Sequence, residues 1–162
     1  MTPSLDSAVR PKVLLATFGT LGDLHPFIAV ALALKRRGVV PIIAAAPDYR
    51  AKIEVEGIRF QPMRPDMQAM TQRLQMPERA LARAAAKRPD FIVRELVLPH
   101  LQEAYDDIAA IAREVDLIVT HSIAYAAQLA AEAWRIPRLS VALQPMIFFS
   151  AYDPPWLAQA PG

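Results

Sequence analysis

Gly19-Thr20-Leu21-Gly22-Asp23-Leu24-His25-Pro26 separates a strand-like apolar run, residues 12–18, from an amphipathic helical pattern. The stretch holds two of only five glycines in the chain. A tight turn of this kind, from a strand into a helix, lies at the carboxyl edge of a parallel sheet, where α/β proteins bind their ligands. The sequence therefore predicts that Asp23 stands at the mouth of a functional edge.

The residues after this turn have the spacing of a helix. Apolar side chains recur at i, i+3, i+4 and i+7 from Phe27, and Pro26 is typical of a first helical turn. Basic residues 35–37 suit a helix C-terminus, and Gly38 can end the helix in the left-handed conformation. His25, directly before the proline, is predicted to cap the helix or to pack.

Apolar runs alternate with helical patterns along the rest of the chain. Strands are expected over residues 12–18, 39–45, 58–61, 116–120 and 138–143, and helices over 26–37, 48–56, 78–87, 91–114 and 123–134. The long helix over 91–114 should be kinked at Pro99, and 62–89 is otherwise irregular. This alternation predicts the α/β class, with a doubly wound, mainly parallel sheet and helices on both faces.

Composition limits the function classes. The chain has 162 residues, 54% of them apolar and 21% charged, which fits one globular domain. It has no cysteine, which excludes disulfides and thiolate sites. Residues 1–11 form a polar tail without the apolar core of a signal peptide, and no apolar run approaches the ~20 residues of a membrane span. We expect a soluble, cytoplasmic protein.

The net charge of +2 is unevenly distributed. Residues 64–88 contain six basic and two acidic residues, whereas 90–116 contain seven acidic and two basic ones. Two interpretations stay open: solvated helix faces, or a basic surface that contacts an anionic membrane at its cytoplasmic side or an acidic ligand. Nucleic acid is not an expected partner, because no aromatic residue lies between Phe60 and Phe91 to stack on bases.

Three chemistries compete for the turn. A dinucleotide-binding turn requires a third glycine and an acid at the end of the second strand, where this chain has alanines 44–46. A phosphate loop requires a Gly-Lys-Ser/Thr ending, which is absent. The third chemistry makes Asp23 a general base next to a helix N-terminus, whose field stabilises a negative charge. The structural alternative is that Asp23 or His25 simply caps the helix.

The other histidines are placed by the same pattern. His100 falls inside the expected long helix, as a surface or packing residue, and His121-Ser122 ends the fourth strand. That strand end faces the same edge as the first turn, so His121 can lie near Asp23. Spacing typical of metal ligands is absent, and no metal site is expected.

Five segments of the chain carry a resemblance to a known family: Gly19 to Phe27, Asp116-Leu117-Ile118-Val119-Thr120, Trp134-Arg135-Ile136-Pro137, Leu143-Gln144-Pro145 and Asp153-Pro154-Pro155. Together they resemble the N-terminal, acceptor-side domain of GT-B inverting glycosyltransferases of the UDP-glycosyltransferase superfamily, in the bacterial branch with sterol glucosyltransferases and rhamnosyltransferases. The resemblance implies a Rossmann-like domain over 12–145, with 146–162 beginning a linker toward a C-terminal donor domain that is absent here.

The resemblance also implies roles for residues. Asp23 would be the catalytic base that takes the proton of an acceptor hydroxyl, and His121 would be an orienting partner, with acid and imidazole exchanged relative to plant relatives. Position at the carboxyl edge adds a predicted acceptor surface: Gly19, Thr20, Gly22, His25, Met67, Ser122, Gln144 and Phe148. The acceptor would be a hydrophobic hydroxylated molecule such as a lipid, sterol or natural-product aglycone.

No cofactor is expected on this domain, because the nucleotide-diphospho-sugar donor would bind mainly to the missing domain. The chain alone would then be inactive or nearly so, as a fragment or as half of a split enzyme. Two other functions stay open from the sequence. One is a non-catalytic module that uses the same fold to hold a ligand or partner, and the other is a dinucleotide-binding domain.

Overall fold

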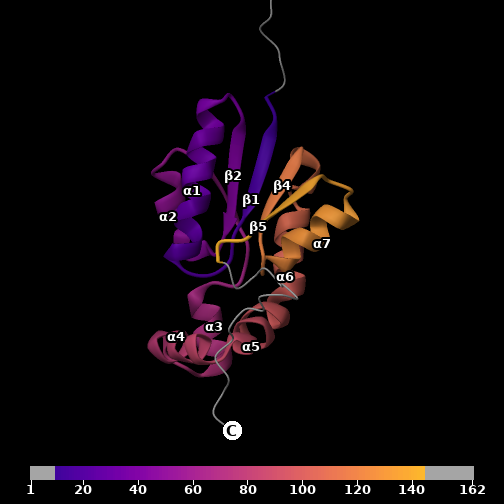
Figure 1. Ribbon diagram of the computed structural model, residues 1–162. Helices are drawn as coiled ribbons and strands as arrows, with labels where there is room; N and C mark the ends of the chain where they lie inside the picture. Colours follow the sequence, from indigo (N-terminus) through magenta and orange to yellow (C-terminus); the bar gives the residue numbers. More distant parts are fainter. Residues whose placement is uncertain (1–9, 145–162) are drawn as a thin grey trace, which may run out of the picture.

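A five-stranded parallel sheet forms the centre of the computed structural model, which describes residues 10–144 (Figure 1). The strand order is β3-β2-β1-β4-β5, and every neighbouring pair is parallel. The strands are β1 Lys12–Ala16, β2 Val40–Ala45, β3 Arg59–Pro62, β4 Leu117–His121 and β5 Arg138–Val141. The α/β class and the parallel sheet expected from the sequence are confirmed.

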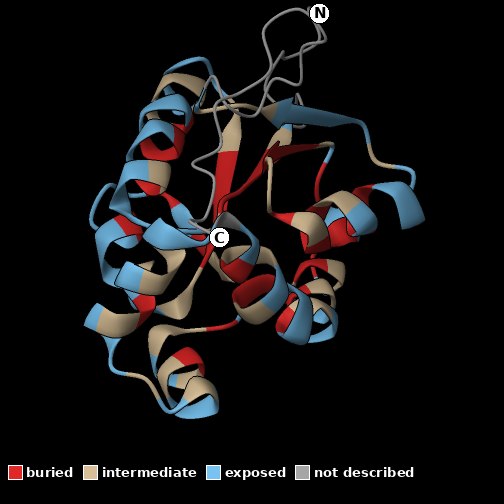
Figure 2. Cartoon of the chain, turned by 60° about the horizontal axis from the view of Figure 1, so that its bottom comes forward, coloured by how far each residue is buried: buried red, intermediate tan, exposed pale blue. Residues whose placement is uncertain are grey.

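Helices cover both faces of the sheet (Figure 1). One face carries α1 Leu21–Arg36 and α2 Arg50–Glu54, with the 3-10 turn η1 Pro47–Tyr49 leading into α2. The other face carries α6 Leu101–Ala109 and α7 Tyr125–Ala133, with the 3-10 turn η4 Ala112–Glu114 after α6. Alternate residues of β1 point to opposite faces, so Leu15 packs with α1 and α2 while Leu14 packs with α6 and α7. Figure 2 shows the buried residues on the strands and on the inner sides of these helices.

The first helix begins five residues earlier than the proline signal predicts. Thr20 is its N-cap, and Pro26 is the sixth residue inside it. The prediction that His25 caps the helix is wrong, because Thr20 and Asp23 already satisfy the free amide groups of the first turn, and His25 is an exposed helical residue. Gly38 has φ +83°, and its N–H donates to Lys35 O, so the expected left-handed ending is confirmed.

The segment predicted to be irregular contains two helices. α4 Glu78–Lys87 coincides with the expected helix, but α3 Met67–Leu74 was not predicted. The carboxylate of Asp66 accepts from Ala69 N and caps α3, and Gln75 ends it in the left-handed region. The cap and the spacing of Met67, Met70 and Leu74 are a helix signal that the surrounding prolines concealed.

The long helix expected over 91–114 is broken. The chain passes through α5 Pro89–Phe91, the π-helical η2 Ile92–Val97 and the 3-10 turn η3 Leu98–His100 before α6 begins. The break falls at Pro99, which lacks an N–H for the helical ladder. Helices α3, α4 and η2 enclose a small core of Met70, Leu81, Phe91 and Leu96 below the sheet (Figure 1). No helix among the described residues is long and apolar enough to cross a membrane.

Candidate functional site

Asp23 lies at the carboxyl edge of the sheet, and its two carboxylate oxygens have different surroundings. Oδ2 accepts from Thr20 N at 2.7 Å and from Thr20 Oγ1 at 3.1 Å. Thr20 Oγ1 in turn accepts from Gly22 N at 3.2 Å, which completes a reciprocal cap at the start of α1. Oδ1 takes no part in this cap, and the side chain keeps 17% of its surface exposed. Asp23 is therefore held rigidly by one oxygen and presents the other.

His121 faces this second oxygen. It is the last residue of β4, and its Nε2 lies 3.7 Å from Asp23 Oδ1. Phe27 meets the imidazole ring edge-on, with the ring centroids 6.4 Å apart. Burial lowers the pKa of His121, and the nearby Asp23 carboxylate only partly opposes this effect. The imidazole is therefore neutral at pH 7, and neither ring nitrogen has a hydrogen-bond partner among the described residues.

Gly19 and Tyr49 support the loop from the other side. The Tyr49 hydroxyl donates to Gly19 O at 3.0 Å, and Gly19 has φ +125°. Burial, followed by the charges of Asp48, Asp23 and Glu78, raises the pKa of Tyr49. Its hydroxyl thus stays protonated and can donate to the loop at neutral pH. Tyr49 ends η1 directly after β2, so it reaches the first turn from the neighbouring strand.

Two further hydroxyl groups lie near Asp23 and His121. Thr17 is buried, and its Oγ1 donates to the backbone oxygen of Asp23 at 3.3 Å. Ser122 follows His121, and its Oγ is buried without a partner among the described residues. Sequence reasoning missed Thr17, Tyr49 and Phe27. For Thr17 and Tyr49 the available signal was their position just past the ends of β1 and β2, whereas Phe27 was read only as a core residue.

The structure brings together some of the predicted site residues and separates others. Gly19, Thr20, Gly22 and Asp23 form one turn, beside His121. His25 is exposed on the helix, Met67 is half-buried and packs with Phe18 against the small lower core, and Gln144 is exposed at the end of the described part. Phe148 lies outside the described residues. His100 is buried, with Nδ1 3.5 Å from Glu103, which fits its predicted packing role.

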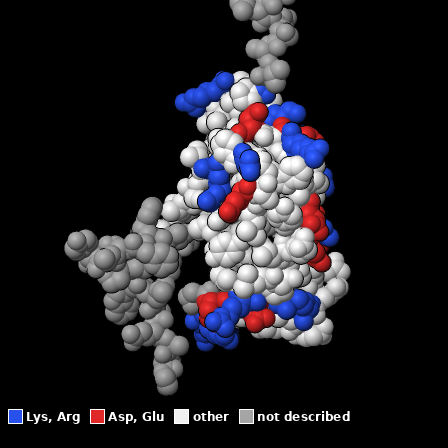
Figure 3. Space-filling view, turned by 90° about the vertical axis from the view of Figure 1, so that its right-hand side faces the viewer, with Lys and Arg blue, Asp and Glu red and all other residues white. Residues whose placement is uncertain are grey.

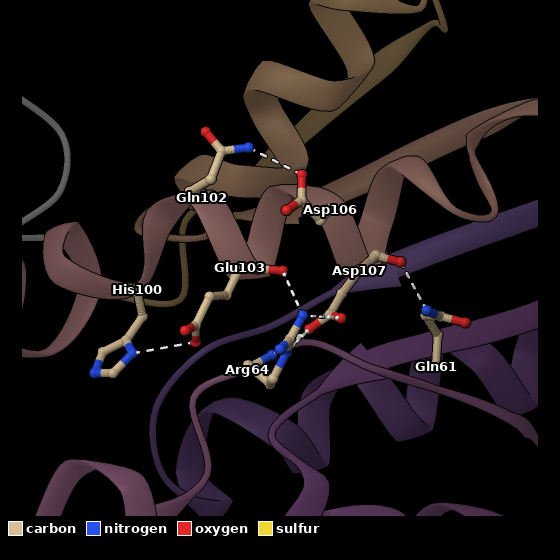
Figure 4. A network of polar contacts seen from close by, with 7 residues as sticks. All are labelled: Gln61, Arg64, His100, Gln102, Glu103, Asp106 and Asp107. Carbon is tan, nitrogen blue, oxygen red and sulfur yellow. Dashed lines mark hydrogen bonds and ion pairs between the residues drawn. The ribbon is translucent and has the colours of Figure 1, made fainter.

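A small apolar pocket opens at the same edge, on the α6–α7 side. Its volume is about 10 Å³, enough for about one water. Phe18, Met63, Leu101 and Tyr125 are among its lining residues. Arg64, another lining residue, is fixed by α6: Figure 4 shows it joined to both carboxylate oxygens of Asp107. The pocket wall from the β3–α3 loop is therefore anchored independently of the Asp23 turn.

The part of the chain that the structure describes contains no cluster of metal-ligating side chains. Among residues 10–144, no three His, Asp or Glu side chains gather as metal ligands would. A larger hollow of about 690 Å³ lies between η3, α6 and the second half of α7. None of the predicted site residues lines it.

The order 3-2-1-4-5 of a parallel sheet, with helices on both faces, is the arrangement of a Rossmann-like half of the GT-B fold. The family model described as the glycosyltransferase family 28 N-terminal domain matches residues 13–139. The chain belongs to this family. No curated protein sequence matches it.

Solved glycosyltransferase structures share the fold. SnogD from Streptomyces nogalater aligns with a TM-score of 0.62 and 23% identity over 86% of this chain and 36% of SnogD. SsfS6 from a Streptomyces species, solved with thymidine diphosphate, aligns with a TM-score of 0.59 and 19% identity over 81% of this chain and 38% of SsfS6. MurG from Acinetobacter baumannii aligns with a TM-score of 0.55 and 20% identity over 80% of this chain and 34% of MurG. The chain therefore spans little more than a third of these proteins.

Proposed function

We propose that this chain is the acceptor-binding half of an inverting glycosyltransferase, with Asp23 as the general base. The observation that carries the proposal is that the two carboxylate oxygens of Asp23 have different surroundings. A base must stay fixed while its reacting atom remains open to the proton that it removes. Thr20 holds Oδ2, whereas Oδ1 takes no part in the cap and lies 3.7 Å from Nε2 of His121, on a side chain that keeps 17% of its surface exposed.

The reaction follows from this geometry. An acceptor hydroxyl placed on Oδ1 attacks the anomeric carbon of the sugar from the face opposite the leaving group. The new bond joins acceptor oxygen to anomeric carbon, the bond from that carbon to the diphosphate oxygen breaks, and the nucleoside diphosphate leaves with the electron pair. Asp23 takes the acceptor proton, and the anomeric configuration inverts.

His121 is proposed as the positioning partner of the base. A neutral imidazole with its proton on Nε2 would point an N–H at Asp23 Oδ1, and a shift of less than 1 Å would close the 3.7 Å separation to hydrogen-bond length. Such a bond would keep Oδ1 in place without adding a positive charge that weakens the base. Because β4 and α1 carry the two groups, the fold sets their separation.

The substrates are proposed from the surroundings and from the relatives. The apolar side chains around Phe18 at the carboxyl edge support a hydrophobic acceptor that carries a hydroxyl, such as a lipid, sterol or aglycone. Such an acceptor would lie on this surface, because the pocket there holds only about one water. The structural relative SsfS6 was solved with thymidine diphosphate, which supports a nucleotide-diphospho-sugar donor. We propose that the donor binds mainly to a second α/β domain, since this chain matches only about a third of each relative.

The test is Asp23→Asn in the full-length gene product, assayed with nucleotide-sugar donors. Asparagine keeps an oxygen that can accept from Thr20, so the helix cap survives while the base is lost. We expect transfer to fall by about 10²-fold or more. Asp48→Asn is the matched control, because Asp48 is an exposed carboxylate at the same edge that accepts from Met67 N and does not contact Asp23.

Transfer by Asp23→Asn at the rate of the control would overturn the base assignment. Absence of transfer by the native protein would instead favour a non-catalytic binding module. His121→Gln separates the positioning role from the catalytic one. We expect it to lower kcat with little change in KM and to leave a residual rate above that of Asp23→Asn.

A further inference from the structure

The positive charge of this protein is concentrated in one part of the fold. Residues 67–97, here called the lower unit, contain α3, α4, α5 and η2 around their own small core. The lower unit contains six of the chain's 18 basic residues and three of its 16 acidic residues. The remaining chain contains twelve basic and thirteen acidic residues. The lower unit is thus cationic, whereas the remaining chain is close to neutral.

Half of these basic side chains are paired locally, three bases sharing two acids. Arg73 pairs with Glu95 at 3.2 Å, and Arg88 pairs with Asp90 at 3.3 Å. Arg94 also approaches Asp90, at 4.0 Å. On the face drawn in Figure 3, acidic and basic side chains lie together at the lower end of the molecule. These pairs cannot be the source of an attractive surface.

The other three bases form a stripe on α4. Arg79, Arg83 and Lys87 are spaced by four residues, so they lie along one side of the helix, and all three are exposed. None has an acidic partner within salt-bridge distance in the part of the chain that the structure describes. Like charges at this spacing lower helix stability by a few tenths of a kcal/mol per pair. The arrangement is therefore unfavourable for folding alone.

The lower unit is joined to the candidate site. Asp48, at the edge that carries Tyr49, accepts from Met67 N at 2.9 Å and fixes the start of α3. Phe18, which precedes the Asp23 turn, packs against the core of the lower unit. The opposite side of α4 carries Leu81, which is buried in that core. The stripe therefore faces away from the core of a unit that is attached to the carboxyl edge.

We propose that the stripe of Arg79, Arg83 and Lys87 docks this protein on an anionic phospholipid surface. The role of this docking rests on the proposed function: it would bring the candidate site to a hydrophobic acceptor held in a membrane. The geometry itself favours lipid over other polyanions. The three charges lie in a row on a convex helix and suit a flat array of phosphates, and no aromatic residue between Phe60 and Phe91 offers stacking to nucleobases.

The expected strength follows from surface electrostatics. Each basic residue near an anionic leaflet contributes about fivefold in binding, so the stripe contributes about 100-fold. The attraction is screened within ~8 Å at physiological salt, which makes the binding salt-sensitive.

The experiment is co-sedimentation of the 162-residue chain with vesicles of phosphatidylcholine alone and of phosphatidylcholine with phosphatidylglycerol. The test variant is R79Q/R83Q/K87Q, whose exposed positions tolerate glutamine in a helix. The matched control, R36Q/R37Q/K52Q, removes the same charge from exposed positions on α1, its C-cap and α2. We expect the native chain and the control to bind the anionic vesicles in low salt, and the stripe variant to lose most of this binding.

Equal loss in both triple variants would overturn the proposal, since net charge and not the stripe would then decide binding. So would equal binding of all three proteins, or failure of the native chain to bind. Polyglutamate that binds the native chain while anionic vesicles do not would assign the stripe to an acidic protein partner instead. None of these outcomes depends on sugar transfer, so the proposed function can fail separately.

Discussion

A Cβ atom added to Gly19 would lie 2.4 Å from Oδ2 of Asp23, closer than any real contact of this kind. The backbone of Gly19 has φ +125°, a conformation that other residues rarely adopt. The glycine therefore does two things at once. It permits the turn, and it leaves the space in which the Asp23 carboxylate meets Thr20.

Gly19→Ala should consequently damage both stability and the site. We expect a loss of about 1–3 kcal/mol in the free energy of unfolding from backbone strain, with displacement of the Asp23 carboxylate in addition. Gly38→Ala is the control, because Gly38 also has a positive φ of +83° but has no atom within 4 Å of the added Cβ. Urea denaturation of both variants measures the difference. A smaller loss for Gly19→Ala than for Gly38→Ala would contradict the steric argument.

Thr20 should be replaceable by serine but not by alanine. Its hydroxyl accepts from Gly22 N and donates to Asp23, and serine retains both bonds. Thr20→Ala should cost about 1 kcal/mol of unfolding free energy, the usual value for a lost N-cap, whereas Thr20→Ser should cost much less. Thermal unfolding of the two variants provides the measurement. Equal losses would show that the methyl group and not the hydroxyl of Thr20 is important.

The sequence predicted the sheet and the Asp23 turn well for a physical reason. A parallel sheet buries both faces, so its strands are apolar runs such as 39–45, and its first turn needs glycine. The positions of Asp23 and His121 at one edge followed from the topology alone. These features depend on patterns that are local in the chain.

The features that sequence reasoning missed depend on pairings across the chain. One exception is local: Pro26 suggested a helix start, but the cap between Thr20 and Asp23, only three residues apart, places that start at Leu21. The α3 helix depends partly on Asp48, which lies 19 residues before its partner Met67. The contribution of Tyr49 to the Gly19 loop spans 30 residues. The periodic pattern of apolar residues cannot reveal contacts between residues so far apart in the chain.

Stability should depend on pH through His121. Burial lowers its pKa in the folded state, so below about pH 6.5 the unfolded chain binds a proton that the folded protein excludes. The unfolded state then binds more protons, and the free energy of unfolding falls as the pH falls, by at most about 1.4 kcal/mol per pH unit. His121→Gln should flatten this slope. His25 and His100 are present in both proteins, so the difference between the two urea series isolates His121. Parallel slopes would contradict the assignment.

The polar network in Figure 4 gives a stability prediction away from the Asp23 turn. Asp107 Oδ2 accepts from Arg64 N at 3.0 Å and from Arg64 Nε at 2.9 Å, and Oδ1 accepts from Arg64 Nη2 at 2.9 Å. Its side chain is only 14% exposed, so water replaces these bonds poorly. Asp107 thus anchors the loop between β3 and α3 to α6.

Asp107→Ala should therefore lower the free energy of unfolding by about 1–2 kcal/mol, because a charge-assisted fork and a backbone bond are lost together. Asp106→Ala is the matched control on the same helix. Asp106 is exposed, and its carboxylate accepts only from Gln102, at 2.9 Å, among the described residues. Its removal should change stability by less than about 0.5 kcal/mol. Urea denaturation of the two variants side by side is the measurement, and equal losses would mean that Arg64 is held by contacts other than its fork with Asp107.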